Sequence, residues 1–108
     1  CYSCRNVCPM CYCKDCILDR LNPSWIYRST NISENTAFHL SRAFHLAGRC
    51  IECGECERVC PVDIPLMKLN QKFSKEVEEK YGYRPGIDPE AKPLQSSYRP
   101  DDKEDFIL

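Results

Sequence analysis

The chain lacks most of the features by which enzymes and membrane proteins are recognised from sequence. None of its apolar runs approaches the ~20 residues that cross a bilayer. Its formal net charge is -1 and its basic residues form no stripe, so we expect neither a membrane span nor a nucleic-acid interface. G-x-G-x-x-G, P-loop and nucleophile-elbow motifs are also missing. We therefore expect no catalytic site within this chain.

Cysteine, by contrast, is present in excess. The 108 residues include ten cysteines, which crowd into residues 1–16 and 50–60. A secreted disulfide scaffold is one explanation for a small Cys-rich chain, but neighbours at i+2 and i+3 are too close to pair without strain. No signal peptide is visible either. The spacing favours shared metal centres in a reducing compartment, which we predict to be the cytoplasm.

One cysteine run is specific enough to name a cofactor. Residues 50–61 read C-x2-C-x2-C-x3-C-P and contain Cys50, Cys53, Cys56 and Cys60. This run is typical of a 4Fe-4S site that sends its fourth thiolate to a neighbouring cluster. Structural zinc is the alternative metal, although zinc usually takes two separated C-x2-C pairs. The run predicts iron–sulfur chemistry.

The same motif begins the chain. Residues 1–9 align without a gap on residues 53–61. In this alignment Cys1, Cys4 and Cys8 match Cys53, Cys56 and Cys60, in that order. The counterpart of Cys50 would lie three residues before Cys1. We therefore expect more protein upstream, including one further ligand.

Three cysteines remain outside both motif copies. They are Cys11, Cys13 and Cys16. A free cysteine is often a small buried apolar residue. Three of them within six residues, directly after a candidate ligand, are better explained as metal ligands. They could hold a third iron–sulfur cluster, or one of them could replace the missing upstream ligand.

Helical periodicity accounts for most of the remaining sequence, and no strand alternation is found. A short helix is expected over residues 15–21, and a longer one over 34–47, capped by Ser33 and ended by Gly48. The apolar stripe of the longer helix consists of Ala37, Leu40, Phe44 and Ala47. A third helix follows Pro65, ends at Gly82, and should pack against the second.

Residues 83–108 differ in composition from the helical domain that we expect over residues 1–82. They contain four prolines and have no helical period. They are either a disordered tail or an extended arm along a partner. The isolated apolar residues that could anchor such an arm are Ile87, Leu94, Tyr98, Phe106, Ile107 and Leu108.

These features together resemble a known domain. The two cysteine runs and the helical spacer are similar to the α-helical two-cluster ferredoxin domain of the C-type subunit of heterodisulfide reductase and of succinate dehydrogenase iron–sulfur subunits. The segment from Cys8 to Cys16 resembles formate dehydrogenase and coenzyme F420 hydrogenase β-type subunits. The resemblance implies an all-α fold with two 4Fe-4S clusters. One cluster would take Cys50, Cys53, Cys56 and Cys8, and the other Cys1, Cys4, Cys60 and the upstream ligand.

The resemblance also implies a function. It predicts electron transfer as part of a multi-subunit oxidoreductase of anaerobic metabolism. The partners would be other redox subunits of flavoprotein, hydrogenase, formate dehydrogenase or heterodisulfide reductase type. An alternative is the C-terminal part of a flavin-containing β-type subunit that itself acts on F420 or NAD(P)H. A structural zinc-binding module is a third interpretation.

Overall fold

Four α-helices make up most of the regular structure in a computed structural model that describes residues 1–101. The described residues contain no strand, so the expected all-α class is confirmed. None of their helices combines the length and the apolar composition needed to cross a bilayer. The elements follow in the order α1 (Ser3–Asn6), α2 (Ile32–Leu46), α3 (Glu55–Arg58), α4 (Leu66–Tyr81) and a short 3-10 helix (Leu94–Ser96).

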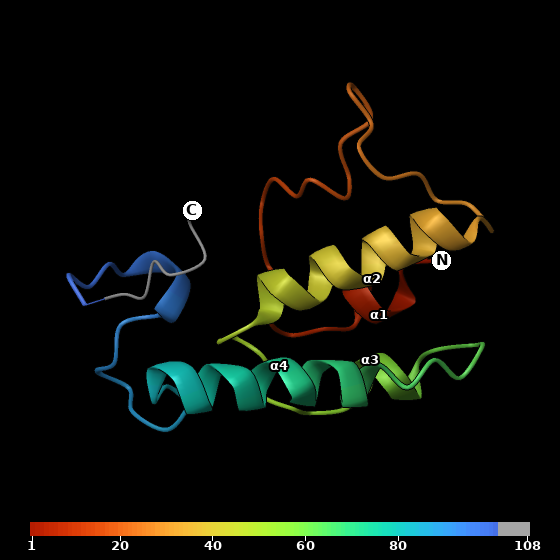
Figure 1. Cartoon of the computed structure of the whole chain (residues 1–108). Helices are drawn as coiled ribbons and strands as arrows, with labels where there is room; N and C mark the ends of the chain where they lie inside the picture. Colours follow the sequence, from red (N-terminus) through yellow and green to blue (C-terminus); the bar gives the residue numbers. More distant parts are fainter. Residues whose placement is uncertain (102–108) are drawn as a thin grey trace.

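The two long helices, α2 and α4, lie side by side and form the body of the molecule (Figure 1). The short helices α1 and α3 contact each other, and α3 also packs against α4. Each short helix belongs to one copy of the cysteine motif. The fold therefore brings the two copies together, although the whole of α2 separates them in the sequence.

The start of α2 is capped by an earlier residue than the sequence pattern predicts. The pattern favours Ser33, whereas the observed N-cap is Asn31, whose Oδ1 accepts a hydrogen bond from the backbone N–H of Ser33 at 2.8 Å. Asparagine and serine cap helices about equally well, so neighbouring candidates compete and local backbone geometry decides. At the other end, Gly48 has a φ of 71°, as a helix-ending glycine should.

The buried face of α2 is rotated away from the predicted apolar stripe. In that stripe, the side chain of Leu40 is 43% exposed and that of Phe44 is 58% exposed. The residues that α2 does bury are Phe38, Arg42, Ala43 and Leu46. Because this face contains an arginine, a search for apolar periodicity alone selects the wrong side of the helix.

Helix α4 follows its predicted period more closely. Leu66 and Val77 are buried, and Gly82 ends the helix with a φ of 60°. The ring of Phe73 meets that of Phe44 edge-on, with 4.8 Å between the ring centroids. The predicted packing of the two long helices is therefore confirmed.

The loop between α1 and α2 contains no helix, so the prediction over residues 15–21 is wrong. These residues form turns, in one of which the N–H of Asp19 donates to the carbonyl of Cys16 at 2.9 Å. Arg20 forms an ion pair with Asp15 at 2.6 Å. Local turns and ion pairs therefore hold this loop, and its residues form no amphipathic helix.

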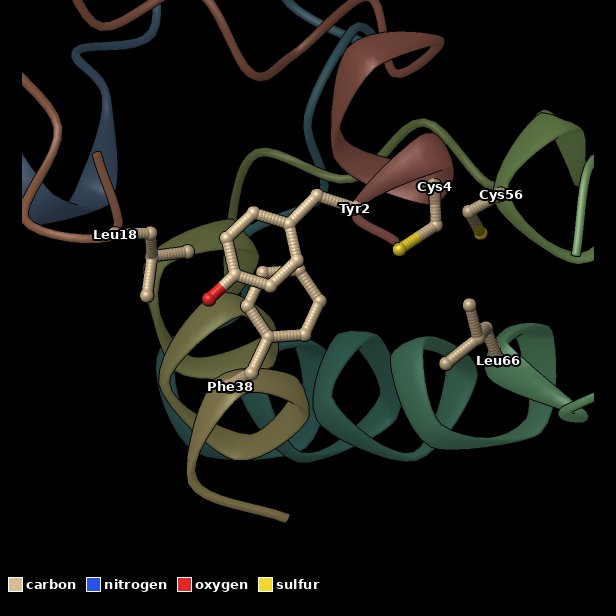
Figure 2. Packing of buried hydrophobic residues seen from close by; sticks show 6 residues of the cluster. All are labelled: Tyr2, Cys4, Leu18, Phe38, Cys56 and Leu66. Atoms are coloured by element: carbon tan, nitrogen blue, oxygen red, sulfur yellow. The ribbon is translucent and has the colours of Figure 1, made fainter. Parts of the chain in front are cut away.

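The hydrophobic core is small and contains two thiols. Figure 2 shows its buried members, which are Tyr2, Cys4, Leu18, Phe38, Cys56 and Leu66. The Tyr2 and Phe38 rings stack with 3.9 Å between centroids and an interplanar angle of 5°. Cys4 of α1 and Cys56 of α3 lie close to Leu66 at the start of α4 (Figure 2). Since both thiols are candidate ligands, the core and the cofactor sites share residues.

Part of the C-terminal arm rests on the end of α2. The side-chain amide of Gln95 donates to the carbonyls of Phe44 and Ala47, at 2.9 and 3.0 Å. The Phe44 carbonyl also accepts from the N–H of Ala47 at 3.1 Å, so Gln95 adds a second donor at this helix end. Leu94 lies so near Gly48 that a Cβ added there would be 3.2 Å from it. Order in this part of the arm therefore comes from contacts with α2 of the same chain, whereas we expected either a disordered tail or an arm along a partner. Three predicted anchors fall outside the described residues: Phe106, Ile107 and Leu108.

Candidate metal centres

The two motif copies fold into the same local backbone. α1 and α3 each begin after a residue in the left-handed conformation, which is Tyr2 (φ 62°) in the first copy and Gly54 (φ 79°) in the second. In each copy, the N–H groups three and four residues further on donate to the carbonyl of that residue, at 3.0 to 3.1 Å. The duplication seen in the sequence is therefore a structural repeat.

The first candidate site is a cavity that joins both copies, here called the Cys50 cavity. Four thiols line it, those of Cys8, Cys50, Cys53 and Cys56. The structure thus brings the last cysteine of the first copy to the first three of the second. The volume is about 10 Å³.

The second candidate site, here called the Cys1 cavity, repeats this arrangement with the copies exchanged. Its lining contains Cys1 and Cys4 of the first copy and Cys60 of the second. Its volume is about 200 Å³. Phe38 and His39 of α2 form part of the wall. The crossing of Cys8 and Cys60 between the two copies is therefore present in the geometry of the fold.

Hydrogen bonds to sulfur occur in both cavities. In the Cys50 cavity, Sγ of Cys50 accepts from the backbone N–H of Glu52 at 3.4 Å, and Sγ of Cys56 accepts from the amide of Asn70 at 3.5 Å. In the Cys1 cavity, Sγ of Cys60 accepts from the N–H of Ile64 at 3.4 Å. Donors of this kind stabilise negative charge on a thiolate and on the cluster that it binds. The donor set fits 4Fe-4S clusters.

Burial and hydrogen bonding separate the acidities of the thiols. Burial raises the pKa of Cys4 and of Cys50. Cys8 differs, because the hydrogen bond from the Cys11 thiol lowers its pKa to about 5, even though burial opposes this. The same interaction raises the pKa of Cys11. Since the thiolate is the form that binds metal, this hydrogen bond favours the ligand form of Cys8.

A buried arginine lies between the cysteine groups. Arg42 is only 4% exposed and its Nη2 donates to the carbonyl of Cys4 at 3.1 Å. Burial lowers its pKa, but the neighbouring thiols of Cys11, Cys4 and Cys8 outweigh burial and raise it. A guanidinium this deep in a small domain needs negative partners. Thiolates and anionic clusters would provide them.

Cys11, Cys13 and Cys16 lie in neither cavity. They line a separate space, here called the Cys11 cavity, beneath the C-terminal half of α2. In residues 1–101, no three metal-ligating side chains stand close enough to hold one single ion. The thiols are arranged around cavities, and the ligands of a cuboidal cluster bind separate iron atoms.

Two residues that shape these sites are absent from the set predicted by the sequence. Arg42 lies one turn from Phe38 and from Leu46 on the buried face of α2. Asn70 is buried one turn after Leu66 on α4. In both cases a polar residue at a core position of the helical period is the signal that could have found them.

Comparison with known proteins agrees with this geometry. Residues 1–65 match the 4Fe-4S dicluster domain family. The chain is 37% identical over 95 residues to the F420-dependent formate dehydrogenase subunit beta of Methanocaldococcus jannaschii, covering 87% of this chain and 24% of that protein. It is 38% identical over 93 residues to the F420-dependent formate dehydrogenase 1 subunit beta of Methanococcus maripaludis, covering 86% and 23%. The chain thus spans about a quarter of the length of these relatives.

The family match covers both motif copies, the spacer helix between them and every cysteine that lines the Cys50 and Cys1 cavities. Two 4Fe-4S clusters are what that family carries, and the thiols and sulfur-directed donors of this fold suit them. The chain belongs to the family of 4Fe-4S dicluster domains.

Proposed function

We propose that the chain transfers electrons through two 4Fe-4S clusters whose ligands cross between the motif copies. The cluster in the Cys50 cavity takes Cys8, Cys50, Cys53 and Cys56. The cluster in the Cys1 cavity takes Cys1, Cys4 and Cys60, with a fourth ligand from upstream sequence. The observation that carries this proposal is that the last cysteine of each copy lines the cavity of the other. When bound, each cluster supplies reversible one-electron chemistry.

The protein's own contribution is to hold and tune these groups. The amide of Asn70 and the N–H groups of Glu52 and Ile64 donate to ligand sulfurs and so favour the more negative, reduced state. Arg42 supplies positive charge beside both motif copies. The stacked rings of Tyr2 and Phe38 cover the side of the Cys1 cavity and limit access of water.

For the whole protein, we propose an iron–sulfur segment of an F420-linked formate dehydrogenase β-type subunit. The names of the two relatives support this, and so does their similarity over almost the entire chain. Electrons would pass between a partner redox subunit and a flavin-bearing part of the same polypeptide in the cytoplasm. In the second candidate the flavin-bearing part reacts with NAD(P)H instead of F420, so the two candidates differ in the identity of the electron donor.

We also propose a role for the arm in binding the partner subunit. Leu94 and Gln95 fix its middle to α2, while Ile87 and Tyr98 on either side are 72% and 78% exposed. Changing Ile87 and Tyr98 to serine should weaken association with the partner and leave iron content unchanged. Equal association of the double variant and the wild type would show that the arm is no partner contact.

The electron-transfer proposal is tested with the full-length protein, purified without oxygen. Reduced F420, NADPH and dithionite are added in parallel, and reduction of the clusters is followed by electron paramagnetic resonance. We expect reduction by dithionite and by reduced F420, and little by NADPH. If dithionite reduces only one 4Fe-4S centre in this domain, the two-cluster path is wrong. If NADPH reduces the clusters as fast as reduced F420, the assignment of the donor is wrong.

A further inference from the structure

The three cysteines that the dicluster family does not require are gathered in one place. Cys11, Cys13 and Cys16 all line the Cys11 cavity, although their loop has no regular secondary structure that would bring them to one side. The other face of this cavity is formed by α2 and the turn after it, through Arg42, His45 and Arg49. The cavity is therefore built by two separate segments. It adjoins the Cys50 cavity, because the thiol of Cys11 is hydrogen-bonded to Cys8, but it contains none of the proposed ligands of the two family clusters.

The Cys11 cavity resembles the Cys50 cavity in its lining. Both are compact spaces whose walls contain several thiols, and in both cavities the thiols face side chains of α2.

The charges around the cavity select an anionic occupant. Its lining includes three guanidinium groups, those of Arg5, Arg42 and Arg49, and no carboxylate from the described residues. Arg49 donates to the carbonyl of Met10 at 2.9 Å and lies 3.9 Å from Sγ of Cys13. Fixed in this way, the guanidinium can donate to thiolate and to inorganic sulfide. Zinc brings no sulfide that could accept such bonds.

We propose that Cys11, Cys13 and Cys16 hold a third iron–sulfur cluster, of 4Fe-4S type, in the Cys11 cavity. His45 lies on the same lining, one turn after Arg42 on α2, and takes the fourth ligand position. The cluster with three thiolates is anionic. The guanidinium groups of Arg42 and Arg49 supply positive charge beside it, whereas Arg5 is ion-paired with Asp19. This centre goes beyond the two-cluster function proposed above and does not depend on it.

The test compares metal content in the full-length protein, purified without oxygen, by elemental analysis and sulfide determination. The triple variant Cys11→Ser, Cys13→Ser and Cys16→Ser should lose about four irons and about four sulfides per chain relative to the wild type. Its reduced spectrum should keep the signals of the two family clusters. The matched control is Cys8→Ser, which should lose a similar amount of iron from a different signal.

A second variant guards against failure of the triple variant to fold. His45 is exposed, so His45→Ala should leave the fold intact and change the spectrum of the third centre alone. Unchanged iron and sulfide in the triple variant would overturn the proposal, as would loss of one zinc without loss of iron. Unchanged iron in Cys8→Ser would instead count against the two-cluster ligand assignment and leave the third centre standing.

Discussion

The two motif copies share a backbone and differ in the segment that comes after it. Both close a turn after their last cysteine, in which the N–H of Cys11 donates to the carbonyl of Cys8 and the N–H of Asp63 to that of Cys60. Beyond the turn, the second copy runs into α4, whereas the first enters a loop with two more cysteines. The copies themselves contain the seven cysteines that we propose as ligands of the two family clusters. The divergent part gives one copy a helix and the other an additional thiol-lined cavity.

The two copies also place different residues at the left-handed position before each short helix. Each short helix begins after a left-handed residue, and glycine meets this requirement at Gly54 because it has no Cβ. At the same position the first copy has Tyr2, which adopts a φ of 62° while stacked on Phe38 and buried. Aromatic packing therefore offsets the backbone strain. The ligand geometry of the first copy depends on the core more than that of the second.

Removal of iron should have the largest effect, and it should destabilise the two short helices more than the two long ones. We expect amide hydrogen exchange in α1 and α3 to rise by more than about tenfold after chelation, because their mutual contact surrounds the ligands. Exchange in α2 and α4 should rise less, since Phe44 and Phe73 still hold them together. An equal rise in all four helices would show that the clusters support the whole fold evenly.

Gly54→Ala should destabilise the second copy by about 2 kcal/mol, because a left-handed alanine is strained and its Cβ would lie 3.1 Å from Nη1 of Arg58. Gly82→Ala is the matched control, since Gly82 has a φ of 60° and no atom within 4 Å of an added Cβ. It should cost about 1 kcal/mol, from the strain of a left-handed alanine alone. Thermal unfolding of the holoprotein measures both. Equal costs would mean that close packing at the motif is unimportant.

Asn70→Leu should make the reduction potential of the cluster in the Cys50 cavity more negative. The variant removes the donor to Sγ of Cys56, and a hydrogen bond of about 1 kcal/mol corresponds to roughly 40 mV for one electron. The cluster of the Cys1 cavity should not shift. Gln71→Leu, at an exposed position beside it, is the control. A titration in which both clusters or neither shift would contradict this assignment.

Tyr2→Phe should have the smallest effect, and unlike Gly54→Ala it should stabilise the protein. The hydroxyl of Tyr2 is buried and has no hydrogen-bond partner in the described part of the chain. Its removal should stabilise the protein by about 1 kcal/mol, while the ring keeps its stacking on Phe38. Tyr98→Phe, on an exposed ring, should change stability by less than about 0.5 kcal/mol. A destabilised Tyr2→Phe would indicate that the hydroxyl is bound in the complete protein.

The fold class and the pairing of the two motif segments could be predicted because the spacing of the cysteines is specific to one type of iron–sulfur site. The run from Cys50 to Cys60 predicts the exchange of a fourth ligand, and the duplicated run predicts with which segment the exchange occurs. The cavities place Cys8 and Cys60 accordingly. The period of α4 could also be predicted, since Leu66 and Val77 face the core with little competition from polar residues.

The parts that could not be predicted depend on tertiary contacts that no local sequence pattern shows. Apolar periodicity selects the wrong face of α2 because Arg42 is buried for its charge. The helix expected over residues 15–21 is replaced by turns that bring Cys16 to the Cys11 cavity. The docking of Gln95 on α2 joins segments that no local pattern relates. Each of these features depends on tertiary contacts.

The crossing of ligands between the copies is tested most directly by Mössbauer spectra of iron-57-labelled Cys8→Ser and Cys60→Ser in the full-length protein. Cys8→Ser should alter the cluster whose potential responds to Asn70→Leu, and Cys60→Ser should alter the other cluster. Each variant should leave the remaining cluster unchanged. If Cys8→Ser instead perturbs the cluster of Cys1 and Cys4, each motif copy binds its own cluster and the crossed assignment is wrong.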